Sequence, residues 1–206
     1  MISVILRMQR GRKVKALTKV RTVLLGCFCL VSCWLPEKFD ATLVIDKTRH
    51  YQFTYDGTLA FSTALDAFKE KGRLSPEDDK AFQAEAAKMR KAKGVTRADY
   101  VGNGRMRVRL HEEGMVRPGT KFFMDLAEFQ NGPNGSIRIV GPTIGPDERK
   151  QLEASGLDLD GDIRMTSALV VTEHNASTTP WFGGLWGAYK WHVDKNQKVT
   201  PTAVLK

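Results

Sequence analysis

The sequence has little cysteine and no long apolar run. Its 206 residues include three cysteines, Cys27, Cys29 and Cys33, and all of them precede residue 34. We therefore expect neither disulfides nor cysteine-based metal sites in the rest of the chain. No stretch of eighteen apolar residues occurs, so we expect no ordinary membrane-spanning helix.

Acidic residues are missing from the first 32 positions, where seven Lys and Arg residues lie between Arg7 and Arg21. The whole chain has a formal net charge of +9, whereas residues 33–206 carry 25 Lys and Arg against 23 Asp and Glu, a net charge of +2. The basic character that could suggest a nucleic-acid partner thus belongs mainly to the N-terminal segment. We expect no nucleic-acid partner.

An apolar run, Thr22–Val31, follows the basic segment. Its length is typical of the apolar region of a signal peptide. The run ends in Leu30-Val31-Ser32-Cys33, which resembles the lipobox of bacterial lipoproteins. That resemblance implies cleavage between Ser32 and Cys33 and lipidation of the Cys33 thiol. An ordinary secretory signal peptide and a short uncleaved anchor remain alternatives, and Met8 is a second candidate start.

A lipoprotein of this kind would lose residues 1–32 as its signal peptide and keep residues 33–206 as a single envelope domain. Several acyl chains hold a protein durably to a bilayer. Trp34 follows the cysteine, so the Asp that retains enteric-type lipoproteins in the inner membrane is missing. We therefore expect a palmitate-type anchor in the cell membrane or, more specifically, the outer membrane, with the domain facing the periplasm or the exterior.

The pattern of residues 33–206 predicts an α+β fold, an antiparallel or mixed β-sheet with two to three helices, preceded by a signal-peptide helix. Helix signals include Ser75 as N-cap before Pro76, and Gly72 and Gly156 as C-terminal stops. The expected helices lie near residues 61–72, 75–93 and 146–156. The expected strands are Phe39–Asp46, His50–Tyr55, Arg105–Leu110, Phe122–Phe129, Ser136–Val140, Ile163–Val171 and Tyr189–Val193.

Motifs for catalysis or metal binding are weak. Asp158-Leu-Asp160-Gly-Asp162 begins like a calcium loop, but Ile163 and Leu169 stand where glycine and an acid are needed. Glu173 and His174 follow a predicted strand without a nucleophile motif such as G-x-S-x-G. We expect no metal, no catalytic residue and no cofactor beyond the lipid on Cys33. A hydrolase or accessory enzyme that uses Glu173 and His174 is the alternative.

Arg105, Arg107 and Arg109 alternate with apolar residues, so a strand places the three side chains on one face. Two interpretations remain open. Nearby acids neutralise the arginines, with Glu112, Glu113, Asp125 and Glu128 as candidates, or the arginines contact a phosphate or an anionic glycan.

Large apolar side chains gather in a glycine-rich segment, Pro180–Gly187. Trp181, Phe182 and Trp186 either fold back over the core or contact a bilayer, a lipid or a partner, where tryptophan is enriched.

The C-terminal third resembles the LppM-like group of bacterial lipoproteins. The resemblance rests on Gly156-Leu157, the strand Ile163–Val171, the His174-Asn175-Ala176 turn and Tyr189-Lys-Trp191. It implies a small α+β envelope domain without known catalytic residues. The sequence thus predicts a membrane-anchored, non-catalytic protein that binds a lipid, a glycan or an envelope protein.

Overall fold

Two long strands begin the fold. The computed structural model describes residues 34–181 and 187–206. β1 (Trp34–Ile45) and β2 (His50–Phe61) form an antiparallel hairpin. The Asp46 carboxylate closes the turn by accepting hydrogen bonds from the Thr48 and His50 amides at 2.8 and 2.9 Å. Apolar and polar residues alternate along both strands, so one face of the hairpin is buried.

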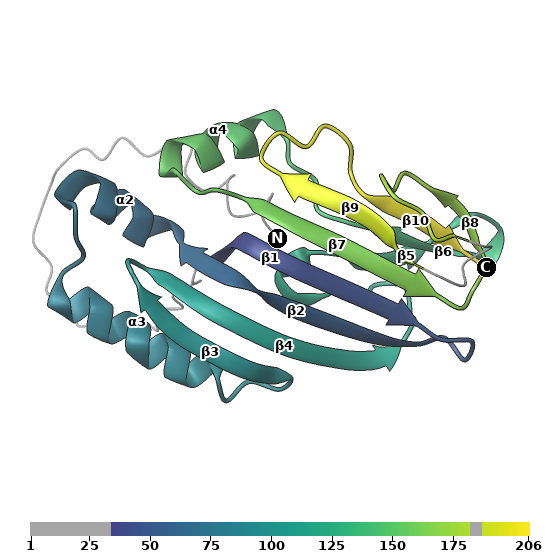
Figure 1. The fold of residues 1–206 in the computed structure, drawn as a ribbon, viewed down its shortest axis with the longest axis horizontal. Coiled ribbons are helices and arrows are strands. Elements are labelled where there is room, and N and C mark those ends of the chain that lie inside the picture. The colour runs from purple at the N-terminus through teal and green to yellow at the C-terminus, as the bar shows by residue number, and fades with distance from the viewer. Residues whose placement is uncertain (1–33, 182–186) are drawn as a thin grey trace, which may run out of the picture.

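Six strands make the large sheet. The additional strands are β3 (Val95–Gly102), β4 (Arg105–Met115), β7 (Asp160–Ser167) and β9 (Tyr189–Asp194). Their order is β3-β4-β2-β1-β7-β9. β1 and β7 pair in parallel and all other neighbours are antiparallel, so the sheet is mixed (Figure 1).

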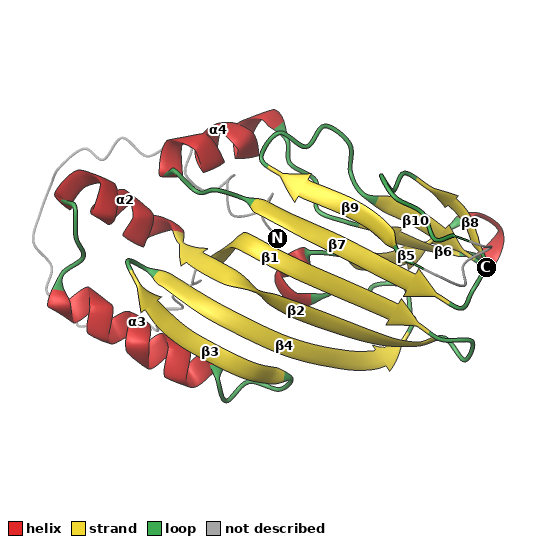
Figure 2. Ribbon diagram, viewed as in Figure 1, coloured by secondary structure: helices red, strands yellow, loops and turns green. Residues whose placement is uncertain are grey.

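Four short strands make the small sheet, with antiparallel order β5-β6-β10-β8. These are β5 (Glu128–Asn131), β6 (Ile137–Val140), β10 (Thr202–Leu205) and β8 (Val171–His174). The small sheet lies at the end of the molecule away from α2 and α3 (Figure 2). Its residues share one buried cluster with the large sheet, and Phe129 contacts Tyr51 of β2 at a centroid distance of 5.6 Å.

Three helices cover the other end. α3 (Pro76–Met89) places Phe82 against Trp34 and Phe61, at centroid distances of 5.9 and 5.1 Å. α2 (Ser62–Lys71) and α4 (Pro146–Ser155) enclose a second buried cluster around Ala60. Since successive strand residues point to opposite faces, Ala60 and Phe61 place these helices on opposite faces of the large sheet.

The α+β fold is confirmed, and so are the Ser75 N-cap and the left-handed stops at Gly72 and Gly156. The strand predicted at Phe122–Phe129 is wrong. Residues 123–125 form a 3-10 turn in which Met124 and Asp125 have φ values of 56° and 53°, a left-handed backbone that breaks a strand. The predicted strand Ile163–Val171 also divides, because β7 ends at Ser167 and β8 begins at Val171.

Candidate functional site on the open face of the large sheet

One face of the large sheet carries polar side chains from β1, β2, β4, β7 and β9. We call this surface the open face. It is the face opposite to the small sheet, and α2 and α4 cover only the part near Ala60. The register aligns these side chains in rows across the strands. One row contains Arg109, Asp56, Asp40, Asp162 and His192, and the next contains His111, Thr54, Thr42, Arg164 and Lys190.

The three arginines of β4 do lie on one face, as their alternation predicts, and all three have carboxylate partners. Arg107 contacts Asp56 at 2.5 Å, and Arg109 donates from Nε to the same carboxylate at 2.9 Å and from Nη2 as well. Arg105 binds Glu37. The neutralising acids are therefore Asp56 and Glu37, and the candidates named from the sequence are wrong. Asp56 stands opposite Arg109 in the β2–β4 register.

Glu37 reaches Arg105 because β1 has a bulge between Pro36 and Lys38. An extra residue in one strand redirects its side chain. Glu37 is only 7% exposed, and both of its oxygens accept from the guanidinium at distances of 2.8–3.1 Å. This two-pronged hydrogen bonding raises the pKa of Arg105 above its ordinary value. Because the charge of the buried Glu37 carboxylate is neutralised by Arg105, we assign Glu37 a structural role.

Asp56 illustrates how the face balances its charge. Partial burial alone would raise the pKa of Asp56, but the hydrogen bonds and charges of Arg109 and Arg107 outweigh burial and lower it. The same balance lowers the pKa of Asp162, which Lys190 and His192 contact at 2.9 and 3.2 Å. Arg164 adds a contact to Asp40 at 2.7 Å. The open face is thus a surface of matched charges.

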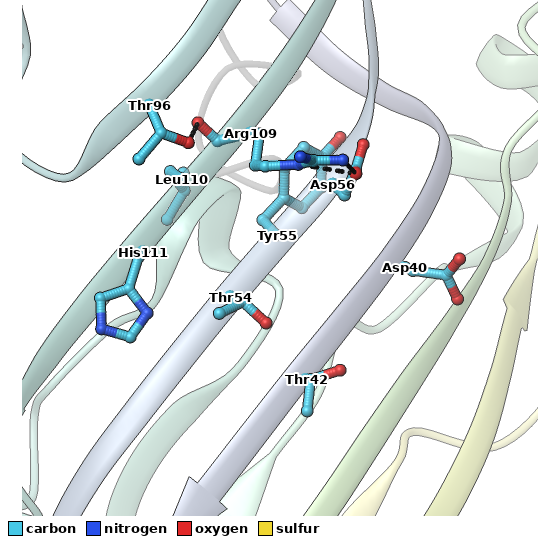
Figure 3. A pocket seen from close by; sticks show the side chains of 9 residues that line it. All are labelled: Asp40, Thr42, Thr54, Tyr55, Asp56, Thr96, Arg109, Leu110 and His111. Carbon is cyan, nitrogen blue, oxygen red and sulfur yellow. Dashed lines mark hydrogen bonds and ion pairs between the residues drawn. The ribbon is translucent and has the colours of Figure 1, made fainter.

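A hollow of about 410 Å³ lies on this face between β1, β2 and β4 (Figure 3). Thr42, Thr54 and His111 stand in a row on the three strands along one side of it. Asp40, Asp56 and Arg109 also line it. Among the described residues, neither threonine hydroxyl has a hydrogen-bond partner, whereas Arg109 and Asp56 are joined to each other. The hollow therefore combines these two threonine hydroxyls with charged side chains that are already paired, and the His111 ring beside them lies 3.9 Å from the Glu113 carboxylate.

Sequence patterns could not single out this hollow. Thr42 and Thr54 are twelve positions apart, and His111 lies in another hairpin. Only the strand register brings them together. The alternation of polar and apolar residues shows which face they share, but no local signal reports their neighbours.

Trp181 is 72% exposed. This exposure contradicts the interpretation in which Trp181 folds back over the core, one of the two left open by the sequence, while Phe182 and Trp186 lie outside the described residues. Nearby Thr178 bridges Lys190, which pairs with Arg164 and hence with Thr42 of β1. This register places Thr178, three residues before Trp181, toward the C-terminal half of β1, away from Trp34.

Glu173 and His174 are neighbours on β8, so their side chains point to opposite faces. The His174 ring lies 4.9 Å from that of Tyr189, and its Nδ1 accepts a hydrogen bond from the Ala176 amide. Asn175 has a structural role. It accepts hydrogen bonds from Trp191 Nε1 and from the Thr202 amide, both at 2.8 Å. Neither Glu173 nor His174 lines the hollow.

The signal-peptide features, including Leu30, Ser32 and Cys33, lie outside the described residues. Within residues 34–181 and 187–206, no helix has the length and hydropathy to span a bilayer. The same residues contain no group of three or more His, Asp or Glu side chains arranged to hold a metal ion.

No protein-family model matches the chain, and no curated protein matches it. Among solved structures, it is similar to the folded domain of LppM from Mycobacterium tuberculosis, determined by NMR. The TM-score is 0.43 at 11% sequence identity, over 82% of this chain and 89% of that one. The neighbour is a domain of the kind that the sequence resemblance names, but a TM-score this low establishes neither a shared family nor a shared function.

Proposed function

We propose that this protein is a lipid-anchored bacterial envelope protein whose folded domain binds a ligand without catalysis. The lipobox-like Leu30–Cys33 segment and the basic, acid-free stretch before it support the anchor. Cys33 carries the lipid in this proposal, and the signal peptide is cleaved after Ser32. The ligand comes from the envelope: a lipid, a glycan or an envelope protein.

The position of β1 supports attachment without a flexible linker. Trp34 follows Cys33 directly and is already buried, in contact with Phe61 and Phe82. The lipid would therefore hold the helical end of the domain near the bilayer. At about 3.3 Å per strand residue, Thr42 lies about 26 Å along β1 from Trp34. The hollow thus stands well away from the anchored residue.

The open face carries the binding proposal. Its charged side chains are matched with one another, yet its central hollow keeps hydroxyls without partners among the described residues. Ligand sites are typically concave and contain a few polar groups that converge on the bound molecule. The hollow has both features, which supports a binding role. The exposed Trp181 supplies a second candidate contact, for a partner or a second surface rather than for the anchoring bilayer.

Metabolic labelling with an alkyne analogue of palmitate tests the anchor. The wild-type chain, expressed in a bacterium that lipidates such proteins, should incorporate the label, and Cys33→Ala should lose it. Cys29→Ala serves as the matched control and should label like the wild type. Equal labelling of wild type and Cys33→Ala would refute the lipid anchor. For the outer-membrane assignment, wild type should co-sediment with outer-membrane markers in a density gradient, and co-sedimentation with inner-membrane markers would refute it.

A further inference from the structure

We infer that the hollow binds a neutral, hydroxyl-rich ligand, namely a glycan segment. This inference deepens the proposed function and rests on it for the envelope setting. Its starting point is the row formed by Thr42, Thr54 and His111 on three neighbouring strands. Neighbouring strands lie about 4.8 Å apart, so the row presents polar groups at regular intervals across the sheet.

The charges around the row disfavour an ionic ligand. Arg109 and Arg107 share Asp56, and Arg164 occupies Asp40. An anionic ligand in the hollow would lie beside the carboxylates of Asp40 and Asp56, and a cationic ligand would lie beside the guanidinium of Arg109, so either would meet a like charge at a cost. A neutral ligand binds beside the ion pairs without that cost. This argument revises the expectation that Arg105, Arg107 and Arg109 contact an anion.

The free groups match sugar hydroxyls in chemical character. Of the two ring nitrogens of His111, Nε2 lies 3.9 Å from Glu113 Oε2 and Nδ1 has no hydrogen-bond partner among the described residues. A threonine hydroxyl donates one hydrogen bond and accepts others. A sugar hydroxyl has the same dual capacity, so each pairing can form in either direction. The threonine methyl groups and imidazole carbons add apolar surface beside these polar atoms, which suits the C–H faces of a sugar ring.

The shape of the hollow also favours a glycan over an acyl chain. Its volume of about 410 Å³ is within the usual range for small-ligand sites, about 300–1,000 Å³. It is a surface depression on the open face, lined by seven threonine, histidine, aspartate and arginine residues together with Tyr55 and Leu110 (Figure 3). An acyl chain needs an enclosed apolar tunnel to leave water, whereas a sugar keeps part of its surface hydrated.

Saturation-transfer NMR measures the binding of sugars to the purified full chain in phosphatidylcholine nanodiscs. The probes are four neutral oligosaccharides, tetra-N-acetylchitotetraose, maltotetraose, mannotetraose and galactotetraose, with a heparin tetrasaccharide as the anionic comparison. At least one neutral sugar should bind saturably. Thr42→Val and Thr54→Val, which exchange a hydroxyl for a methyl in a strand, should each weaken that binding about fivefold. Thr166→Val, also on the open face but outside the hollow, should leave binding unchanged.

Three results would overturn the inference: no binding of any neutral sugar at millimolar concentration, binding that Thr42→Val and Thr54→Val do not alter, or tighter binding of the heparin fragment than of every neutral sugar. Far-ultraviolet circular dichroism of each variant separates lost binding from lost folding. The anchor is judged independently. A labelled Cys33 chain that binds no sugar refutes only the hollow, and an unlabelled chain that binds a neutral sugar refutes only the anchor.

Discussion

At the scale of single residues, two glycines make room for Phe39 in the buried face of the large sheet. Phe39 pairs with Gly57 on β2 and with Gly161 on β7, so its ring lies between positions without side chains. A Cβ atom added at Gly161 would stand 2.4 Å from the Phe39 ring. Such a distance is too short for carbon atoms, and the ring is buried with little space to move.

Gly161→Ala should therefore destabilise the protein by about 1–3 kcal/mol, the usual cost of overpacking a core. Urea unfolding monitored by circular dichroism measures the change. The double variant Phe39→Leu/Gly161→Ala is the control, because a smaller side chain at position 39 relieves the contact, so the two losses of stability should be less than additive. Equal stability of Gly161→Ala and wild type would show that Phe39 does not pack as described.

Substitution of two tryptophans in the C-terminal part of the chain should change the stability of the protein to different extents. Trp181 is exposed, so Trp181→Ser should change the free energy of unfolding by less than about 0.5 kcal/mol. Trp191 is buried and donates to Asn175, so Trp191→Phe should cost about 1–2 kcal/mol through the lost hydrogen bond and volume. Thermal unfolding compares the pair. A large loss in Trp181→Ser would mean that this side chain packs against the domain.

At the scale of elements, β4 shows why a run of alternating arginines is stable on a strand. Like charges on one face repel, but the register of β2 places Asp56 beside Arg107 and Arg109, and the β1 bulge brings Glu37 to Arg105. The neutralising acids come from β1 and β2, and they precede their arginines by about 50 to 70 positions in the sequence. The charges on the open face are thus balanced by the way the strands pair, because β4 alone carries the arginines and β1 and β2 supply the acids.

This pairing predicts acid sensitivity. The hydrogen bonds and charges of Arg109 and Arg107 hold the pKa of Asp56 below its ordinary value of 3.8, so the folded state binds this proton less tightly than the unfolded state. The resulting stability is present above the unfolded-state pKa and is lost as pH falls through the folded-state pKa. Wild type should lose stability below about pH 4, as measured by urea unfolding at several pH values.

Asp56→Asn should be less stable than wild type at pH 7, by about 1 kcal/mol for two partly exposed ion pairs, and should show a smaller further loss in acid. Asp158→Asn is the control, since it removes the same charge from an exposed contact with Lys38 at 4.0 Å. Parallel pH profiles for wild type and Asp56→Asn would contradict a stabilising role for the Asp56 pairs.

At the scale of the whole molecule, the sequence predicts local elements better than their arrangement. Ser75, Gly72 and Gly156 mark helix ends correctly because capping depends on a few adjacent residues. The division into two sheets and the parallel β1–β7 pair depend on contacts between distant segments, which no local pattern reports. The predicted strand at Phe122–Phe129 fails for the same reason, because its aromatic residues pack into the core from a turn.

The candidate site could likewise be predicted from the sequence only in part. The common face of Arg105, Arg107 and Arg109 follows from a side-chain period of two. Their partners and the Thr42–Thr54–His111 row follow from strand register, which the sequence does not reveal. The lipobox-like segment Leu30–Cys33 differs from both. A lipobox is a short linear motif, so the resemblance is visible in the sequence alone, and lipidation of Cys33 stays a prediction.

Mass spectrometry of the N-terminal peptide of the mature protein, purified from bacterial membranes, decides whether the domain is held by a lipid. A peptide that begins at Cys33 and carries a diacylglyceryl group is the expected result. A peptide that begins at Cys33 or Trp34 without lipid, or one that retains residues preceding Cys33, would contradict the lipid-anchored envelope protein proposed from this sequence.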